Sequence, residues 1–280
     1  MDDFISVAVP ARLANLEYNQ TLVNRNFLQA ITSIIELSQP RIAKSDLIRV
    51  GQNADGGYVI SPEFHSYVCL NLGVGYEVTA DIDLIQNGFE IFAFDGTVPN
   101  PLPEETSYHF HQKNIGYEKK DERNINLQRI FQTYLKLQNL DLLLIDIEGH
   151  EYKILERELN FVTQAKQIVV EFHGLELLGD EQFSERFISI LEKLMKSHYP
   201  IHIHANNAGG VLPIGGASWP TILEITFLAK EYCSNVINFG PFPTALDFPN
   251  TLARPDVDLT PFYGMEKNYA SLARTVLGLP

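Results

Sequence analysis

Short apolar runs alternate with amphipathic stretches between residues 67 and 230 of the chain. The amphipathic stretches repeat apolar side chains three or four positions apart, as helices with one buried face do. The apolar runs are nearly continuous, which is typical of parallel strands covered by helices on both faces. The seven predicted strands are YVCLNLG (67–73), FEIFAFD (89–95), YHFHQKNIG (108–116), DLLLIDIEG (141–149), QIVVEFH (167–173), IHIHANN (201–207) and TILEITFLAK (221–230).

Helical stretches follow most of the first five predicted strands, but the segment between the last two, AGGVLPIGGASWP, has the character of a loop without a helix. A connection without a helix favours an antiparallel last pair, because a parallel pair needs a longer crossover. The pattern therefore predicts an α/β fold with a seven-stranded, mainly parallel sheet. Its last strand is antiparallel, and helices lie on both faces.

The two ends of the chain differ from this central pattern. Residues 21–37 place apolar side chains at helical spacing, and Pro40 ends that helix. The tail after Lys230 is rich in Pro, Phe and Asn, with little periodicity. We expect it to pack on the core, as a lid or as the contact of a homo-oligomer, because its aromatic side chains would be costly to expose. The predicted parts are an N-terminal helical extension (1–45), a core domain (46–230) and a C-terminal extension (231–280).

Charge and composition narrow the range of partners and compartments. The formal net charge of −14 argues against nucleic acid and against an anionic membrane surface. No stretch is apolar enough to span a bilayer, and the acidic start MDDFISVAVP does not resemble a signal peptide. The two cysteines, one of them in an apolar run, argue against a disulfide framework or a cysteine-based zinc site. We therefore expect a cytoplasmic protein.

The ends of the first two predicted strands carry a glycine loop and an acid. Gly73 and Gly75 form a G-x-G turn, but a dinucleotide fingerprint would place a third glycine where Val78 stands. Asp95 ends the second strand about 20 residues further on, as do acids that bind ribose hydroxyls in nucleotide-binding sheets. A tight turn without a ligand and a plain turn residue before Gly96 are the alternative interpretations.

The fourth and fifth predicted strands end in ionisable side chains. Asp146 and Glu148 follow an apolar run and share one side of the strand, as Glu171 and His173 do on the next. A buried carboxylate is costly unless it is paired, so this edge of the sheet should face a polar cleft. These groups could act as a general base with its orienting partner, or hold a divalent metal. Glu151 has the simpler interpretation of stabilising the start of the next helix.

Taken together, these motifs resemble those of the FkbM-type S-adenosylmethionine-dependent methyltransferases, a class I, Rossmann-like family. IDIEGHEYKIL matches the family pattern I-D-x-E-G-x-E, and LNLGVGYE, FAFDGT and VVEFHGLE are similar to its cofactor loop, its acidic strand end and its E-x-H block. RVGQNADGGY and LDFPN (246–250) resemble motifs of one branch. The resemblance runs from Arg49 to about residue 230. His150 stands where many relatives have a small residue, so it receives no role.

The resemblance implies a site for S-adenosylmethionine at the carboxyl edge of the sheet. Gly73, Gly75 and Glu77 would surround its methionine part, and Asp95 would hold its ribose hydroxyls. Asn114 and Ile115, in the sequence KNIG, would flank the adenine, and Asp146 would lie at the reacting end. The family's usual reaction is methylation of a hydroxyl oxygen, often on a sugar or a secondary metabolite.

His173 is the first candidate for the general base, because imidazole titrates near neutral pH. Asp146 and Glu171 would orient His173 or the acceptor. A Mg²⁺-like ion held by these three residues could replace the base by lowering the pKa of the hydroxyl. The candidate acceptor contacts are Asp55, Glu148, Asn206 and Trp219, the last in the glycine-rich loop 208–219.

Two other classes of protein share this kind of sheet. One is an NAD(P)-dependent oxidoreductase, which the missing third glycine and the hairpin-like end of the sheet disfavour. The other is a non-catalytic binding module, which the presence of both the glycine loop and Asp95 disfavours.

Overall fold

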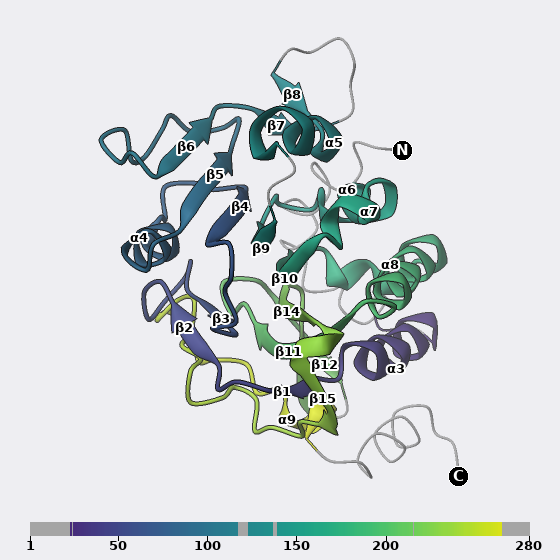
Figure 1. Ribbon diagram of the computed structural model, residues 1–280. Coiled ribbons are helices and arrows are strands. Elements are labelled where there is room, and N and C mark those ends of the chain that lie inside the picture. The colour runs from purple at the N-terminus through teal and green to yellow at the C-terminus, as the bar shows by residue number, and fades with distance from the viewer. Residues whose placement is uncertain (1–22, 24, 117–122, 137–138, 215, 265–280) are drawn as a thin grey trace.

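The computed structural model describes residues 23, 25–116, 123–136, 139–214 and 216–264. A seven-stranded sheet in the order β11-β14-β10-β9-β4-β5-β6 runs through the molecule (Figure 1). β14 is antiparallel to both of its neighbours, and the other pairs are parallel. The predicted fold class is confirmed. The strands are β4 (Val68–Leu72), β5 (Glu90–Phe94), β6 (Tyr108–His111), β9 (Leu140–Ile145), β10 (Ala165–Phe172), β11 (His198–Ala205) and β14 (Leu223–Ala229).

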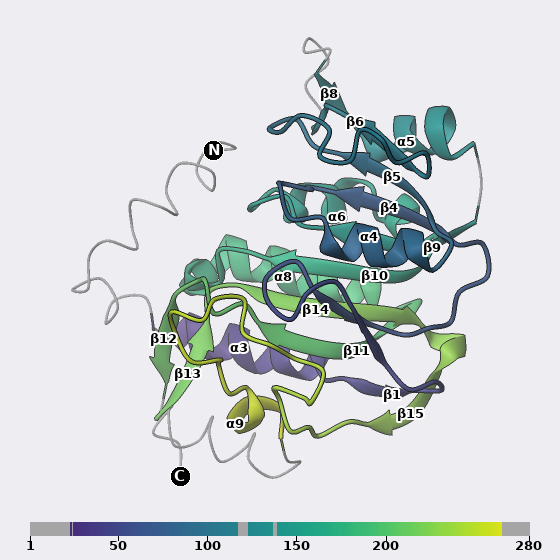
Figure 2. The ribbon, with the colours of Figure 1, turned by 90° about the vertical axis from the view of Figure 1, so that its left-hand side faces the viewer.

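Helices cover both faces of the sheet, as Figures 1 and 2 show. On one face lie α3 (Arg25–Ser38), α5 (Leu127–Ile130), α6 (Glu151–Arg157), α7 (Leu159–Val162) and α8 (Glu181–Leu194). On the other face lie α4 (Thr79–Gln86) and the hairpin of β2 (Ile48–Val50) and β3 (Tyr58–Ile60). Every residue of β4 and β9 is buried, which explains why these strands read as continuous apolar runs.

One connection differs from the prediction. The segment expected to be a plain loop contains a hairpin, in which Val211 pairs with Pro220 and Ile214 with Ala217. Its first strand, VLPI, alternates between exposed and buried positions without alternating in polarity, so the sequence alone carries no strand signal there. The smaller elements are β7 (Asn114–Ile115), β8 (Asn124–Ile125), a π-helical turn (Phe131–Leu135), 3₁₀ turns (Leu175–Gly179 and Lys230–Tyr232), β12 (Val211–Ile214) and β13 (Ala217–Pro220).

The tail packs on the core through its aromatic residues. After β15 (Cys233–Ile237), which pairs with β1 (Arg41–Ala43), the chain buries Phe242 and forms the short helix α9 (Thr260–Tyr263). The Tyr263 hydroxyl lies 2.8 Å from Ser38 Oγ of α3, which joins the tail to the N-terminal helix. The boundaries at residues 45 and 230 stay predictions. Among the described residues, no helix has both the length and the apolar character needed to cross a membrane.

Candidate active site

The glycine loop leaves β4 in contact with the end of β9. At Gly73 φ is +84°, and a Cβ there would lie 1.6 Å from the backbone oxygen of Asp146. This glycine therefore allows two chain segments to approach each other. Gly75 also has a positive φ, of +58°, but a Cβ there would meet no atom within 4 Å. The open space beside Gly75 is on the side where a bound molecule could approach the loop.

Asp95 is buried and holds this loop in place. Its Oδ2 accepts hydrogen bonds from the backbone N–H groups of Val74 and Gly75, both at 2.9 Å. Its Oδ1 accepts two from Thr97, both at 2.6 Å. Burial acts to raise the pKa of Asp95, but these hydrogen bonds outweigh it and lower the pKa below its usual value. The structure thus brings together the loop and the acid that the sequence singled out, with the acid ionised.

The other predicted cofactor residues lie around the same loop. Glu77 accepts hydrogen bonds from the side chain of Gln52 at 2.6 Å and from the Thr79 N–H at 2.8 Å. Asn114 lies against Gly96, where a Cβ would come within 1.9 Å of Asn114 Oδ1. The residues predicted to flank the adenine, Asn114 and Ile115, form β7, and Asn114 is therefore beside the strand end that carries Asp95.

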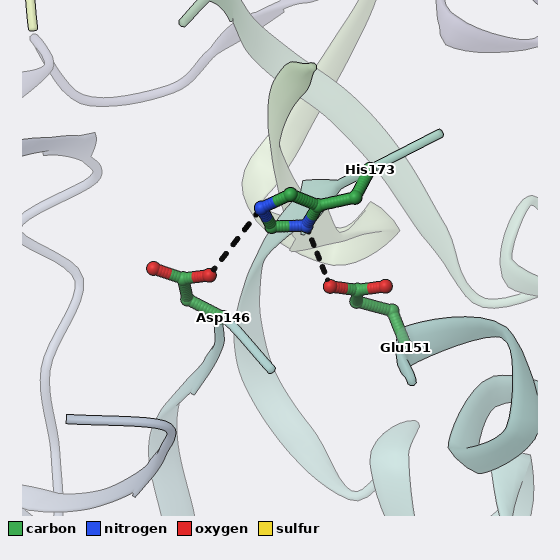
Figure 3. A group of neighbouring side chains, drawn as sticks. All are labelled: Asp146, Glu151 and His173. Carbon is green, nitrogen blue, oxygen red and sulfur yellow. Dashed lines mark hydrogen bonds and ion pairs between the residues drawn. The ribbon is translucent and has the colours of Figure 1, made fainter. Parts of the chain in front are cut away.

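His173 lies at the centre of four carboxylates that follow β9 and β10. Its Nδ1 is 2.7 Å from Glu151 Oε1, the contact drawn in Figure 3. Its Nε2 is 3.3 Å from Glu171 Oε1, 3.4 Å from Glu148 Oε2 and 3.8 Å from Asp146 Oδ1. Strand alternation predicted the neighbours on the Nε2 side.

Glu151 is the partner that the sequence interpretation missed. It stands on the first turn of α6, is fully buried, and accepts hydrogen bonds from the Gly149 N–H and from His173. A helix-start carboxylate is usually solvated, so only its burial reveals that it belongs to the site.

This arrangement favours a protonated imidazole. Burial alone would lower the pKa of His173, but the hydrogen bonds with Glu151 and Glu171 outweigh burial and raise the pKa to about 12. Burial raises the pKa of Glu171 to about 7, against the hydrogen bond from His173. Burial also raises the pKa of Asp146, and the negative charge of Glu171 adds to the effect. At neutral pH the cluster therefore holds an imidazolium beside a carboxyl group that titrates.

Three residues of this cluster could also bind a metal ion. Asp146, Glu151 and His173 each offer one ligand atom, and these atoms lie within 4.8 Å of one another. The predicted set had Glu171 in place of Glu151. Asp146 Oδ1 is buried and has no hydrogen-bond partner. Carboxylate oxygens suit a hard divalent cation, but the imidazolium already supplies a positive charge at this point.

The candidate acceptor contacts separate into two groups. Asn206 donates a hydrogen bond to Glu171 Oε1 at 3.0 Å, and Asp55 Oδ1 accepts one from Asn250 at 3.0 Å. Glu148, whose side chain is 86% exposed, reaches His173 from the rim. Trp219 is instead fully buried, with its ring 5.1 Å from that of Phe262. The structure therefore places Trp219 in the contact between the tail and the core.

The family model described as the methyltransferase FkbM domain matches residues 44–198. A crystal structure of a fibrillarin/Nop5p complex has a similar chain with a TM-score of 0.39 and 11% sequence identity, over 59% of this chain and 73% of that one. No curated protein matches the chain.

Proposed function

We propose that this chain, which belongs to the FkbM methyltransferase family and is thus an S-adenosylmethionine-dependent methyltransferase, methylates a hydroxyl oxygen of a sugar or another small acceptor. The observation that carries the proposal is the carboxyl group of Glu171. It is almost fully buried beside an imidazolium, and its pKa is about 7. A base with a pKa near the working pH is well suited to take the proton of a hydroxyl group. Family membership weighs against both alternatives, the oxidoreductase and the non-catalytic module.

The residues around the glycine loop suit the cofactor. The open side of Gly75 leaves room for the methionine part next to Glu77, and the ionised Asp95 could accept hydrogen bonds from ribose hydroxyls. When bound, S-adenosylmethionine supplies an electrophilic methyl group on a sulfonium. Residues 73–77 would therefore hold the donor, and the carboxylate cluster after β9 and β10 would lie at its reacting end.

Transfer needs an oxygen in line with the bond that breaks and a group that takes its proton. The acceptor oxygen forms a bond to the methyl carbon as the carbon–sulfur bond breaks, and the hydroxyl proton passes to Glu171. Asn206 donates a hydrogen bond to Glu171 Oε1 at 3.0 Å, and His173 Nε2 lies 3.3 Å from the same oxygen. These contacts fix the orientation of the base, so that the oxygen can be aligned before it reacts.

His173 then has a different role from the predicted one of general base. An imidazolium has no lone pair at Nε2, so it cannot accept the hydroxyl proton. We assign His173 a structural role. Its positive charge keeps the side chains of Glu171 and Asp146 together, and Glu151 accepts a hydrogen bond from its Nδ1. The finding behind this revision is the pair of hydrogen bonds with Glu151 and Glu171, which raise the pKa of His173 despite its burial.

The metal-dependent version remains a second candidate because Asp146, Glu151 and His173 could hold a hard divalent ion such as Mg²⁺. Such an ion would lower the pKa of a bound hydroxyl. Dialysis against a chelator separates the two versions. We expect the dialysed enzyme to keep its turnover, and a loss that Mg²⁺ restores would favour the metal.

The reaction can be tested with S-adenosylmethionine carrying a ¹³C-labelled methyl group and a small-molecule extract of the source cells. We expect carbon NMR to show the label bonded to oxygen in a methyl ether. Label bonded to nitrogen or carbon would contradict the proposal. So would the absence of any labelled product while the cofactor binds.

A further inference from the structure

The C-terminal segment 246–256 is held directly against the strands that carry the site. His202 Nε2 of β11 lies 3.0 Å from Asp247 Oδ1, and His204 Nε2 lies 3.2 Å from Asp256 Oδ1. Asn207, at the end of β11, donates to the backbone oxygens of residues 251, 254 and 255 and accepts from the N–H of residue 251. Both histidines and Asn207 are buried, so this segment is anchored in the sheet and forms part of the fold at that edge.

Arg49 joins the same segment to the turn that precedes β3. Its guanidinium donates to the backbone oxygens of Gln52 and Ala54 in the turn and of Leu246 in the tail. It also lies 5.2 Å from the centre of the Phe248 ring. The turn and the tail are therefore positioned together by one side chain.

Asn250 connects this wall to the carboxylate cluster. Its Nδ2 donates to Asp55 Oδ1 at 3.0 Å and to Glu224 Oε1 at 2.9 Å. Glu224 of β14 is paired in register with Glu171 of β10, so the two carboxyl groups are neighbours on one face of the sheet. Asp55 and Asn250 consequently lie next to the proposed base.

The turn with Asp55 also touches the cofactor loop. Gln52 donates to Glu77, and a Cβ on Gly56 would lie 2.2 Å from Glu77 Cγ. Asp55 is thus between the loop proposed to hold the methyl donor and the tail. A molecule that presents its oxygen both to the donor and to Glu171 would pass this residue.

The groups that solvent can reach around this point are hydrogen-bond acceptors with negative charge. Asp55 and Glu148 are exposed, and a third of the Asp146 side chain is accessible. The cations nearby are already paired: Arg49 with carbonyl oxygens, and His204 with Glu224 and Asp256. Arg254, on the outer side of the tail, donates to the carbonyls of Ala208 and Gly209. Such a surface attracts donors and positive charge, and it repels anions.

We propose that Asp55 and residues 246–250 form the acceptor-side wall of the methyl-transfer site, and that this wall selects an acceptor with hydroxyl or ammonium donors and without phosphate or carboxylate groups. The inference rests on the proposed function, since it takes Glu171 as the point where the acceptor oxygen reacts. The wall extends beyond residues 44–198, the part of the chain that the family model matches. Its tail part, residues 246–250, lies outside the matched domain, and Asp55 lies within it.

The charge of the product tests the class of acceptor. The full chain is incubated with methyl-labelled S-adenosylmethionine and an extract of the source cells, and the labelled products are passed over an anion exchanger at pH 8. We expect the methyl-ether label, which carbon NMR distinguishes from the S-methyl label of unreacted S-adenosylmethionine, to pass through unretained. Label retained as an anion would overturn the inference and leave the proposed function standing. If no labelled product forms although the cofactor binds, the proposed function fails, and the inference fails with it.

Variants of the wall test its residues with the acceptor isolated from the unretained fraction. Asn250→Ala and Asp55→Asn should each raise the KM for that acceptor about tenfold, because the first removes the side chain that holds Asp55 and the second removes the negative charge that attracts donors. The affinity for S-adenosylhomocysteine and the kcat should stay close to those of the wild type. Asn160→Ala and Asp46→Asn, at exposed positions outside the site, are the matched controls. An unchanged KM in both wall variants, or an equal rise in the controls, would overturn the inference.

Discussion

At the residue scale, the surroundings of a single imidazole decide which group can take a proton. His173 has contacts to Asp146, Glu148, Glu151 and Glu171, which come from the ends of two strands and the start of a helix. The hydrogen bonds with Glu151 and Glu171 keep the imidazole protonated, and burial brings the pKa of Glu171 to about 7. The base therefore depends on neighbours that only the folded chain assembles.

The titration of Glu171 predicts how turnover depends on pH. The base works in its ionised form, so kcat should rise with pH up to about 7 and level off above it. Below that pH, kcat should fall about tenfold for each unit, because the fraction of ionised carboxylate falls by that factor. Steady-state kinetics at saturating cofactor would show this profile. A kcat that is constant from pH 5 to 9 would contradict the assignment.

Glu171→Gln removes the base and keeps a side chain of similar size. We expect kcat to fall about 100-fold or more, the usual range for a lost general base. The affinity for S-adenosylhomocysteine should be nearly unchanged, since the cofactor residues lie around β4 and β5. Calorimetry and turnover measured on the same preparation give both numbers. Glu185→Gln, at an exposed position on α8, should match the wild type. A Glu171→Gln enzyme with near-normal kcat would return the base role to His173 or to Asp146.

The sequence located most residues of the site, but it could not give their protonation states. Asp95, Asp146, Glu171 and His173 were found because each ends a predicted strand, and parallel strands end at the same edge of a sheet. Glu151 was missed because its position suggested a solvated helix start, and its burial depends on packing from other elements. The roles of all these residues stay predictions until they are tested.

At the element scale, most strands of the main sheet were predictable because they are buried on both faces, as β4 and β9 are throughout. β12 and β13 were not, because each has only four residues and their polarity does not alternate. Helix α8 was predicted from the spacing of Phe183, Phe187 and Leu194, which all lie in the core. Its first residue is set by Asp180, whose Oδ1 accepts a hydrogen bond from the Phe183 N–H at 2.9 Å.

The cap of α8 gives a prediction for stability. Asp180→Ala removes the only side-chain acceptor that the structure shows for the Phe183 N–H, and such caps contribute about 1 kcal/mol. We expect the free energy of unfolding to fall by about that amount, with no change in the affinity for S-adenosylhomocysteine. Urea denaturation of the variant and of Asp46→Ala, an exposed control, would show it. Equal stability of the two variants would contradict the cap.

Asp81, in the first turn of α4, predicts a stability change with pH. Burial raises its pKa to about 7, against hydrogen bonds from Asn71 and Tyr108. An acid whose pKa is higher in the folded state than in the unfolded one loses stability as the pH rises from the unfolded value towards 7. Asp81→Asn should therefore show a smaller fall in Tm between pH 5 and 8 than the wild type. Parallel curves for the two proteins would contradict this origin, and Asp46→Asn should follow the wild type.

At the scale of the whole molecule, the sheet places one functional edge between two added segments. The hairpin of β2 and β3 and the tail after β15 meet beside the carboxyl end of β10 and the amino end of β14 (Figure 2). The sequence predicted that the tail packs on the core, but not which residues it contacts. Those contacts depend on pairs almost 200 positions apart, such as Arg49 with Leu246, which periodicity does not report.

The opposite edge of the sheet carries a polar cavity of about 440 Å³. Its lining includes Lys166 at the start of β10, Lys230 directly after the end of β14, and His65 in the loop before β4. A polar ligand could bind in this cavity instead. The location of the bound cofactor therefore shows which edge of the sheet holds the cofactor site.

A crystal structure of the chain with S-adenosylhomocysteine is the most direct test of where methyl transfer takes place. We predict that the ribose hydroxyls bond to Asp95, that the methionine part lies along residues 73–77, and that the sulfur faces Glu171. A cofactor bound in the cavity at the opposite edge, or a sulfur that faces away from Glu171, would contradict the account.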